Sequence, residues 1–209
     1  MLMNMKELLK VADEKGFAVP AFNIGSDQLL KAVMQQVKEM KSPVILEMSP
    51  DEFNFVENSL IQSMIYEASK TDVPVVIHLD HGDKYETVVR AIQAGFTSVM
   101  IDGSHHPIHD NIQMTKEVVD YAHARGVSVE AEVGTVGGNE DGVIGGIKYA
   151  DLNECVLLVK EAGVDALAPA LGSVHGPYQG EPVLGFTEME AIGKATNMPL
   201  VLHLSLIHI

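Results

Sequence analysis

The chain has 209 residues, 46% of them hydrophobic, and a formal net charge of −15 from 14 basic and 29 acidic residues. This acidity argues against nucleic acid or an anionic membrane surface as a partner, although local donors could still bind a phosphorylated substrate. No apolar run approaches the roughly 20 residues that span a bilayer, and the N-terminus lacks a signal-peptide pattern. The lack of both features predicts a soluble protein, and the single cysteine, Cys155, excludes an internal disulfide and fits a reducing cytoplasm. Its helical context, without a nearby histidine, predicts a small buried hydrophobe rather than a nucleophile.

Apolar periodicity predicts helices and strands that alternate along the whole chain, without a linker or a low-complexity segment. The predicted helices cover residues 4–15, a segment capped by Ser26, and residues 56–70, 85–94, 110–125, 151–162 and 187–196. The seven predicted strands cover residues 18–23, 43–49, 75–82, 98–103, 127–134, 165–170 and 199–203. Strands separated by helices pair in parallel, so the sequence predicts an α/β domain over residues 1–203, either a barrel or a doubly wound sheet.

Polar residues at the strand ends favour the barrel. A doubly wound sheet concentrates its ligand contacts at one switch point, and the first strand–helix junction, residues 23–28, lacks a dinucleotide-binding glycine pattern. Here nearly every predicted strand ends in a polar group: Asn23, Ser49, Asp80, His81, Asp102, Glu132, His175 and His203. A complete (β/α)8 TIM barrel usually needs about 250 residues. We therefore expect an incomplete barrel of about seven strands.

The most informative predicted strand covers residues 75–82, VVIHLDHG. It is apolar at its start and carries ionisable side chains at its C-terminal end. If the pleat continues, Asp80 and His81 point to opposite sides of the strand, so they cannot both be core residues. Alone, the pair could equally be solvated loop residues. His81, His175 and His203 all lie at strand ends, and three imidazoles with a fourth open position form the ligand set of a catalytic zinc. His78, inside the strand, is expected to pack in the barrel or support a ligand.

Three carboxylates have candidate roles beside this metal. Asp80 is suited to proton transfer. Asp102 and Glu132 could hold the histidines or bind a metal at a second position. Glu140 lies in the glycine-rich segment 134–146, which reads either as a mobile lid that carries an acid or base, or as a plain flexible loop.

Four segments together resemble the class II, zinc-dependent ketose-bisphosphate aldolases. These are residues 79–82 (LDHG), 130–134 (EAEVG), 137–142 (GGNEDG) and 172–176 (GSVHG), and the resemblance runs from about residue 4 to His203. It implies reversible cleavage of fructose or tagatose 1,6-bisphosphate to dihydroxyacetone phosphate and glyceraldehyde 3-phosphate through a zinc-stabilised enediolate. It also implies a cytoplasmic lyase of carbohydrate metabolism, of the glycolytic type, that forms homo-oligomers at full length.

The resemblance assigns roles to the strand-tip residues. His81, His175 and His203 match the zinc ligands, and Asp102 and Glu132 match positions associated with a second metal location. Asp80 matches the group that exchanges a proton with the C4 hydroxyl. Glu140 matches the base that deprotonates dihydroxyacetone phosphate.

The resemblance also implies substrate contacts. Gly176 matches a backbone group near the substrate phosphate and a monovalent cation, Na⁺ or K⁺. Asn23 and Ser49 are further expected substrate contacts, although residues 49–54 depart from the glycine-containing loop of many relatives.

The sequence after His203 departs from the family. Relatives continue with a glycine-rich loop, strand eight with a phosphate site, and closing helices, whereas residues 204–209 read LSLIHI. We expect a truncated barrel with an anomalous tail at 204–209. Two unpaired sheet edges would make this chain poorly soluble, and loss of phosphate donors would make it weakly active.

Two other interpretations are compatible with the sequence. A metal-dependent barrel hydrolase usually carries a His-x-His pair on its first strand, which is absent here. An inactive remnant that only binds metal is the second. The sequence does not distinguish fructose from tagatose bisphosphate, which are epimers at C4.

Overall fold

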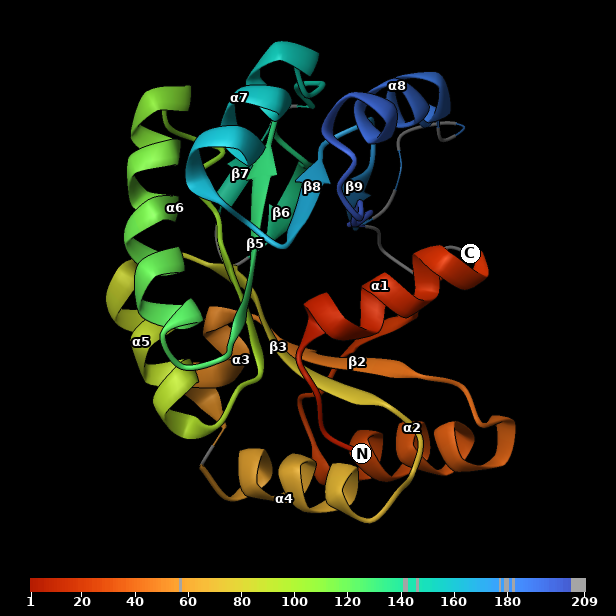
Figure 1. The fold of residues 1–209 in the computed structure, drawn as a ribbon. Coiled ribbons are helices and arrows are strands. Elements are labelled where there is room, and N and C mark those ends of the chain that lie inside the picture. The colour runs from red at the N-terminus through yellow and green to blue at the C-terminus, as the bar shows by residue number, and fades with distance from the viewer. Residues whose placement is uncertain are drawn as a thin grey trace. The chain divides into compact units, whose positions relative to one another are not determined.

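The structure is a computed structural model that describes residues 1–56, 58–140, 143–145, 147–176, 178, 181 and 183–203 (Figure 1). Helices and strands alternate through most of the chain, as the periodicity predicts. The helices are α1 (Met5–Lys15), α2 (Asp27–Met40), α3 (Pro50–Phe55), α4 (Asn58–Ser69), α5 (Tyr85–Ala94), α6 (Ile108–His123), α7 (Leu152–Ala162) and α8 (Phe186–Thr196). The strands are β1 (Ala21–Asn23), β2 (Val44–Met48), β3 (Val75–Gly82), β4 (Ser98–Ile101), β5 (Ser128–Val133), β6 (Gly137–Glu140), β7 (Val143–Gly145), β8 (Ala166–Pro169) and β9 (Val174–His175).

Six of the seven predicted strands form one parallel sheet in the order β1-β2-β3-β4-β5-β8. The prediction of a seventh full strand over 199–203 is wrong for the described residues. There, Leu200 makes only an isolated parallel bridge to Leu167, flanked by hydrogen bonds from the Leu167 N–H to the Pro199 carbonyl and from the Val201 N–H to the Leu167 carbonyl. Pro199 has no N–H of its own to donate, which shortens the ladder.

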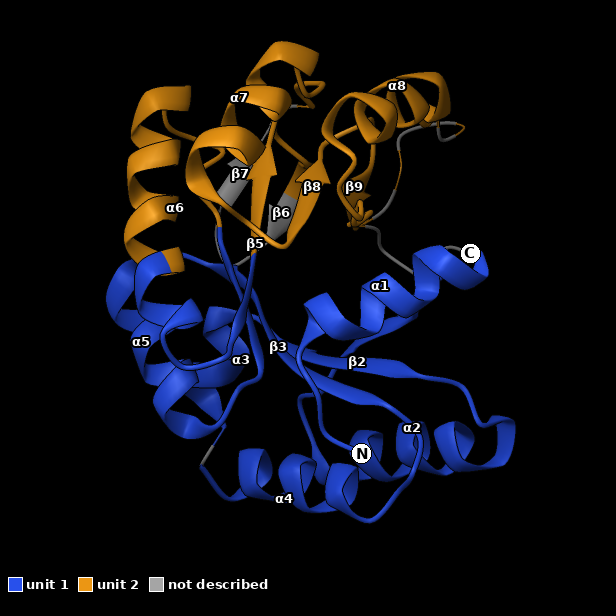
Figure 2. Ribbon diagram, in the orientation of Figure 1, with its two compact units in different colours: residues 1–101, 120–129 blue, residues 102–119, 130–209 orange. Residues whose placement is uncertain are grey.

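The contacts of the chain group into two compact units (Figure 2). Unit 1 comprises residues 1–101 and 120–129, and unit 2 comprises residues 102–119 and 130–209. Strand β5 contributes its first two residues to unit 1 and the rest to unit 2. The single domain over 1–203 stays a prediction, and residues 204–209 lie outside the described part of the chain.

Side-chain caps fix where the first helices begin. The Asn4 side chain accepts the Glu7 N–H at the start of α1, and the predicted cap Ser26 accepts the Leu29 N–H at the start of α2. These oxygens satisfy backbone donors that have no partner within the helix. Helix α3 was not predicted; it begins with a capping box in which Ser49 and Glu52 bind each other's backbone N–H groups.

The interior of each unit is apolar, as expected for strands covered on both faces. In unit 1, Val75, Val76, Ile77 and Leu79 of β3 have no exposed surface, which confirms the prediction of a fully buried strand. In unit 2, Cys155 is buried on α7, and this burial raises the pKa of its thiol to about 12. A thiol that stays protonated is a poor nucleophile, in agreement with its predicted packing role. Across the described residues, every helix is too short or too polar to cross a bilayer.

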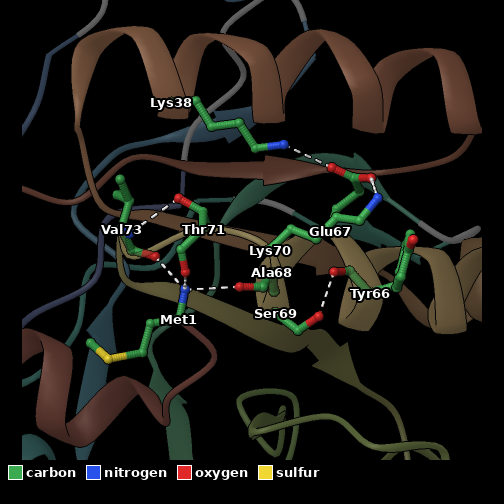
Figure 3. Close-up of polar contacts among 9 residues, drawn as sticks. All are labelled: Met1, Lys38, Tyr66, Glu67, Ala68, Ser69, Lys70, Thr71 and Val73. Atoms are coloured by element: carbon green, nitrogen blue, oxygen red, sulfur yellow. Dashed lines mark hydrogen bonds and ion pairs between the residues drawn. The ribbon is translucent and has the colours of Figure 1, made fainter.

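The amino-terminal ammonium group of Met1 packs against the end of α4 in unit 1 (Figure 3). It donates to the carbonyls of Ala68 at 2.8 Å, Val73 at 2.7 Å, and Thr71. Carbonyls at a helix C-terminus carry partial negative charge and favour a cation there. Desolvation lowers the pKa of this ammonium group, and Asp72 partly opposes that shift. The first residues are thereby tied to the start of β3, where Leu2 bridges Val75.

Glu67, near the end of α4, forms ion pairs with Lys38 and Lys70, and its replacement should change the free energy of unfolding only slightly. Its carboxylate lies 2.9 Å from the Lys38 amine and 3.6 Å from the Lys70 amine (Figure 3). The hydrogen bond from Lys38 lowers the Glu67 pKa, so the stabilisation is present above the unfolded-state pKa and is lost as the pH falls through the folded-state value. We expect Glu67→Gln to lower the free energy of unfolding at neutral pH by no more than about 1 kcal/mol. Urea titrations at low and high salt should show the difference shrinking with salt; a salt-independent loss would contradict the ion-pair explanation.

Candidate functional site

The tip of β3 in unit 1 carries the predicted proton-transfer pair. Asp80 is only 4% exposed, and its carboxylate lies 3.8 Å from the His81 ring. His81 has φ +44°, in the left-handed region, and the β3–β4 register shifts between Leu79 and Gly82. The pleat therefore does not continue to the tip, and the expectation that Asp80 and His81 point to opposite sides does not apply. Bulges re-aim side chains in this way, often beside active sites.

Gly82 allows the bulge to pack closely on β4. A Cβ at this position would lie 2.3 Å from the Met100 carbonyl oxygen, a separation that no side chain tolerates. The His81 N–H points to the Met100 sulfur at 3.4 Å. Deeper in the same strand, buried His78 contacts the Ser98 hydroxyl at 2.9 Å through Nδ1, and this contact does not distinguish packing from support of a ligand. The bulge geometry thus depends on a glycine after the histidine.

Asn23 and Ser49, the expected substrate contacts at the ends of β1 and β2, converge on one carboxylate. The Asn23 amide donates to Glu52 at 3.1 Å, and the Ser49 backbone N–H donates to the same oxygen at 3.0 Å. An anionic substrate group would have to compete with this carboxylate for both donors and would be repelled by its charge. The structure therefore brings Asn23 and Ser49 together on Glu52, and their role as substrate contacts stays a prediction.

In unit 2, His175 and His203 lie next to each other. Their ring centroids are 6.4 Å apart, and each ring offers a nitrogen within 4.8 Å of the other's. His175 is not at the end of β8 as predicted but in the separate short strand β9. His203 follows the segment that runs beside β8. Two imidazoles at this separation can ligate one metal ion.

Asp102 and Glu132 form a second pair of donors in unit 2, with carboxylate oxygens within 4.8 Å of each other. The Ser104 N–H donates to Asp102 at 2.9 Å, and the Val136 N–H donates to Glu132 at 3.4 Å. Buried Asn111 donates to the Glu132 backbone carbonyl at 2.9 Å, which ties α6 to the end of β5. These bonds hold both carboxylates in place.

Glu130 is a buried acid near this site to which sequence reasoning assigned no role. It is 1% exposed, and its carboxylate lies 2.9 Å from Nε2 of His203. The signal was available, because Glu130 and Glu132 are two residues apart on an otherwise apolar strand and so share one face. Two acids on the same face of a buried strand need partners.

The glycine-rich segment contains strands where a lid or a plain loop was expected. Strand β6 pairs antiparallel with β7 and parallel with β9, so that Gly138 lies opposite His175. Glycines relieve crowding at this junction, which explains why their abundance does not prevent a small three-stranded sheet. Glu140 ends β6, and its side chain lies outside the described part of the structure. Gly176 is half-buried with φ +101°, and its role as a phosphate contact stays a prediction.

Replacing Gly138 by alanine should displace His175. Its φ is +105°, and a Cβ would lie 2.1 Å from the His175 carbonyl oxygen. We expect a loss of about 1–3 kcal/mol in the free energy of unfolding, together with weaker zinc binding. Gly126→Ala is the matched control, because Gly126 has φ +72° but open space around its Cβ position. Chemical denaturation and zinc titration of both variants check this; equal zinc affinities would contradict the positioning of His175 by Gly138.

The donor chemistry of unit 2 fits a zinc ion. Neutral imidazole nitrogens and carboxylate oxygens are both common zinc ligands, whereas a calcium or magnesium site would consist of oxygens alone. In unit 2 the histidine pair, His175 and His203, offers nitrogens, and the separate carboxylate pair, Asp102 and Glu132, offers oxygens. His81 and Asp80, in unit 1, are further groups of the same chemical type at a strand tip.

Comparison with known proteins identifies the family. The family model for class II fructose-bisphosphate aldolase matches residues 3–205. The chain is 57% identical to the 6-phospho-5-dehydro-2-deoxy-D-gluconate aldolase of Halalkalibacterium halodurans, over 97% of this chain and 72% of the relative. It is 53% identical to a probable fructose-bisphosphate aldolase of Bacillus subtilis, over 97% of this chain and 73% of the relative.

Solved structures agree with the family model. The YdjI aldolase of Escherichia coli K12 superimposes with a TM-score of 0.88 at 33% identity, covering 99% of this chain and 74% of that chain. A putative fructose-1,6-bisphosphate aldolase of Coccidioides immitis gives a TM-score of 0.88 at 31% identity, covering 96% and 72%. The predicted fold class, an α/β protein of the incomplete TIM-barrel type, is thereby confirmed. The chain belongs to the class II fructose-bisphosphate aldolase family.

Proposed function

We propose that the protein is a zinc-dependent aldolase that reversibly cleaves a phosphorylated ketose or keto sugar acid and releases dihydroxyacetone phosphate. The observation that carries this proposal is the pair His175 and His203, which present ring nitrogens within 4.8 Å of each other in a chain of this family. With His81, they would hold the ion. Asp102 and Glu132 are the residues proposed for a second metal position. Membership of the family supports lyase activity. The dependence on zinc and a monovalent cation near Gly176 are parts of our proposal.

Zinc, when bound, supplies a Lewis acid that polarises the substrate ketone. The residues of the chain handle the protons. As the carbon–carbon bond breaks, Asp80 takes the proton from the hydroxyl on the carbon that becomes the aldehyde. Glu140 gives a proton to the carbon that becomes C3 of dihydroxyacetone phosphate, and it removes that proton in the reverse direction. The burial of Asp80 limits water access to its carboxylate.

Two substrate classes fit this chemistry. One is a ketose 1,6-bisphosphate, fructose or tagatose, whose second product is glyceraldehyde 3-phosphate. The other is 6-phospho-5-dehydro-2-deoxy-D-gluconate, the compound for which relatives at 57% and 56% identity are named. Its ketone at C5 and hydroxyl at C3 place the scissile bond between C3 and C4, so cleavage gives dihydroxyacetone phosphate and 3-oxopropanoate. Relatives named for fructose bisphosphate reach 53% identity, so both classes require assay.

The test measures release of dihydroxyacetone phosphate from each candidate substrate by a coupled NADH assay. The activity assays use the chain continued after His203 by the corresponding part of the Halalkalibacterium halodurans relative, called the extended protein below. We expect turnover of one substrate class, inhibition by EDTA and recovery with zinc. Zinc binding without any turnover would instead support a metal-binding protein, and turnover that EDTA does not affect would contradict the proposal.

We propose a cytoplasmic enzyme of carbohydrate metabolism, with a role of the glycolytic kind if fructose bisphosphate is the substrate, that assembles as a homo-oligomer. The single cysteine supports a reducing compartment, and the net charge of −15 argues against nucleic acid or an anionic membrane surface as a partner. Light scattering of the extended protein tests the assembly.

A further inference from the structure

Glu130 and His203 of unit 2 make a buried polar contact that the proposed reaction does not use directly. Nε2 of His203 lies 2.9 Å from the Glu130 carboxylate, which is a short distance for a charge-assisted hydrogen bond. Glu130 is 1% exposed, and the His203 side chain is 9% exposed. The pair is thus removed from bulk water and is not a surface ion pair of small effect.

The contact with Glu130 determines which imidazole nitrogen of His203 carries the hydrogen. A carboxylate accepts hydrogen bonds, so the imidazole nitrogen facing it must carry the hydrogen. In the neutral ring, a hydrogen on Nε2 places the lone pair on Nδ1. The Glu130 carboxylate thereby selects the nitrogen of His203 that can ligate a metal, and it fixes the rotation of the ring about its bond to the chain.

We propose that Glu130 is a positioning residue for the metal site. Its carboxylate holds the Nε2–H group of His203, so that Nδ1 of the same ring is available to bind zinc. This inference rests on the proposed function insofar as the ion is zinc, but the state of the ring is a property of the chain alone. A carboxylate behind a ligating histidine also raises the basicity of the ligand. His175, with its ring centroid 6.4 Å from that of His203, then supplies the neighbouring ligand.

A purely structural role for Glu130 makes different predictions. If the pair only held β5 to the segment that ends at His203, its loss would lower stability without changing which nitrogen carries the hydrogen. Ser128→Ala provides a matched control on the same strand and face. The buried Ser128 hydroxyl accepts the Met5 N–H at 3.0 Å and donates to the Thr97 carbonyl at 3.5 Å, so its loss perturbs β5 through its contacts with α1 and with the residue before β4.

The first experiment reads the ring directly in the metal-free protein. The 209-residue chain, labelled with ¹⁵N-histidine, is examined by long-range ¹H–¹⁵N correlation at a pH where the ring is neutral. We expect His203 in the Nε2–H form in the wild type and in Ser128→Ala, and a mixture of both forms in Glu130→Met. A wild-type His203 with its hydrogen on Nδ1 overturns the proposal whether or not the protein binds zinc.

The second experiment measures zinc affinity of the same chain by competition with a chromophoric chelator. We expect Glu130→Met to bind zinc about 10- to 100-fold more weakly, Glu130→Gln to recover part of that loss because its amide oxygen still accepts, and Ser128→Ala to match the wild type. Glu130→Met within twofold of the wild type overturns the positioning role. A wild type that binds no zinc, with His203 in the Nε2–H form, supports the positioning of the ring and sinks the zinc-dependent function instead.

Discussion

Replacing His175 by alanine in the extended protein should lower kcat/KM for the cleavage reaction by about 10³-fold, because the charge that stabilises the transition state is lost with the ion. His175 is held by the β6–β9 pairing and lies beside His203, so its removal deletes one of two adjacent imidazoles. Zinc content, measured on the dialysed protein by atomic absorption, should fall in parallel with the activity. Denaturant titration should show a stability close to that of the metal-free wild type.

The control for this variant is another histidine whose side chain is exposed. His109 lies on α6 and is exposed, so His109→Ala should keep both zinc and activity. If His175→Ala keeps its zinc and more than a tenth of its activity, the ion is held elsewhere and the proposed ligand set is wrong.

The second large effect is expected for Asp80→Asn, which keeps the shape of the side chain but removes its capacity to accept a proton. Asp80 is 4% exposed and lies 3.8 Å from His81. We expect kcat to fall about 10²- to 10⁴-fold, with a much smaller change in KM, because proton transfer acts in the transition state. Zinc content should remain that of the wild type. Steady-state kinetics on the extended protein measure both constants.

Asp83→Asn serves as the comparison for this change. Asp83 is three residues further on, is exposed, and pairs with Lys84 at 3.2 Å on the surface. Its replacement should change kcat by less than about twofold. An Asp80→Asn variant that loses zinc along with activity would mean that Asp80 acts by holding the ligand His81 and not by transferring a proton.

The parallel sheet and its helices were predictable from the sequence because their signals are local and repeated. The caps Asn4 and Ser26 and the stop at Gly16 mark helix ends through side-chain and backbone chemistry that short segments already contain. Helix α3 could also have been predicted, since Ser49-Pro50-Asp51-Glu52 has the spacing of a capping box.

The bulge at the end of β3 could not be predicted in the same way. A histidine with positive φ is uncommon, and at His81 it occurs next to the close packing of Gly82 against the Met100 carbonyl. The pairing of Gly138 with His175 likewise depends on a contact between distant segments. Strand-tip chemistry therefore identified candidate ligands, while their orientation came from tertiary contacts.

Glu130 illustrates a third case, in which the residue was visible but its role was not. Its position in EAEVG belongs to a segment that already indicated the family. Only the 2.9 Å contact assigns it to His203, which lies 73 residues further along the chain. A pairwise contact over such a separation leaves no periodic signal in a single sequence.

The most direct test of a zinc-dependent aldolase is the activity of one preparation of the extended protein before and after metal removal. Dihydroxyacetone phosphate release from fructose 1,6-bisphosphate, tagatose 1,6-bisphosphate and 6-phospho-5-dehydro-2-deoxy-D-gluconate is measured in the purified, EDTA-treated and zinc-reloaded states. We predict turnover of one of the two substrate classes, loss of that turnover with EDTA, and recovery at one zinc per chain. Turnover that persists in the metal-free protein, or its absence with all three substrates at full zinc occupancy, would contradict this function.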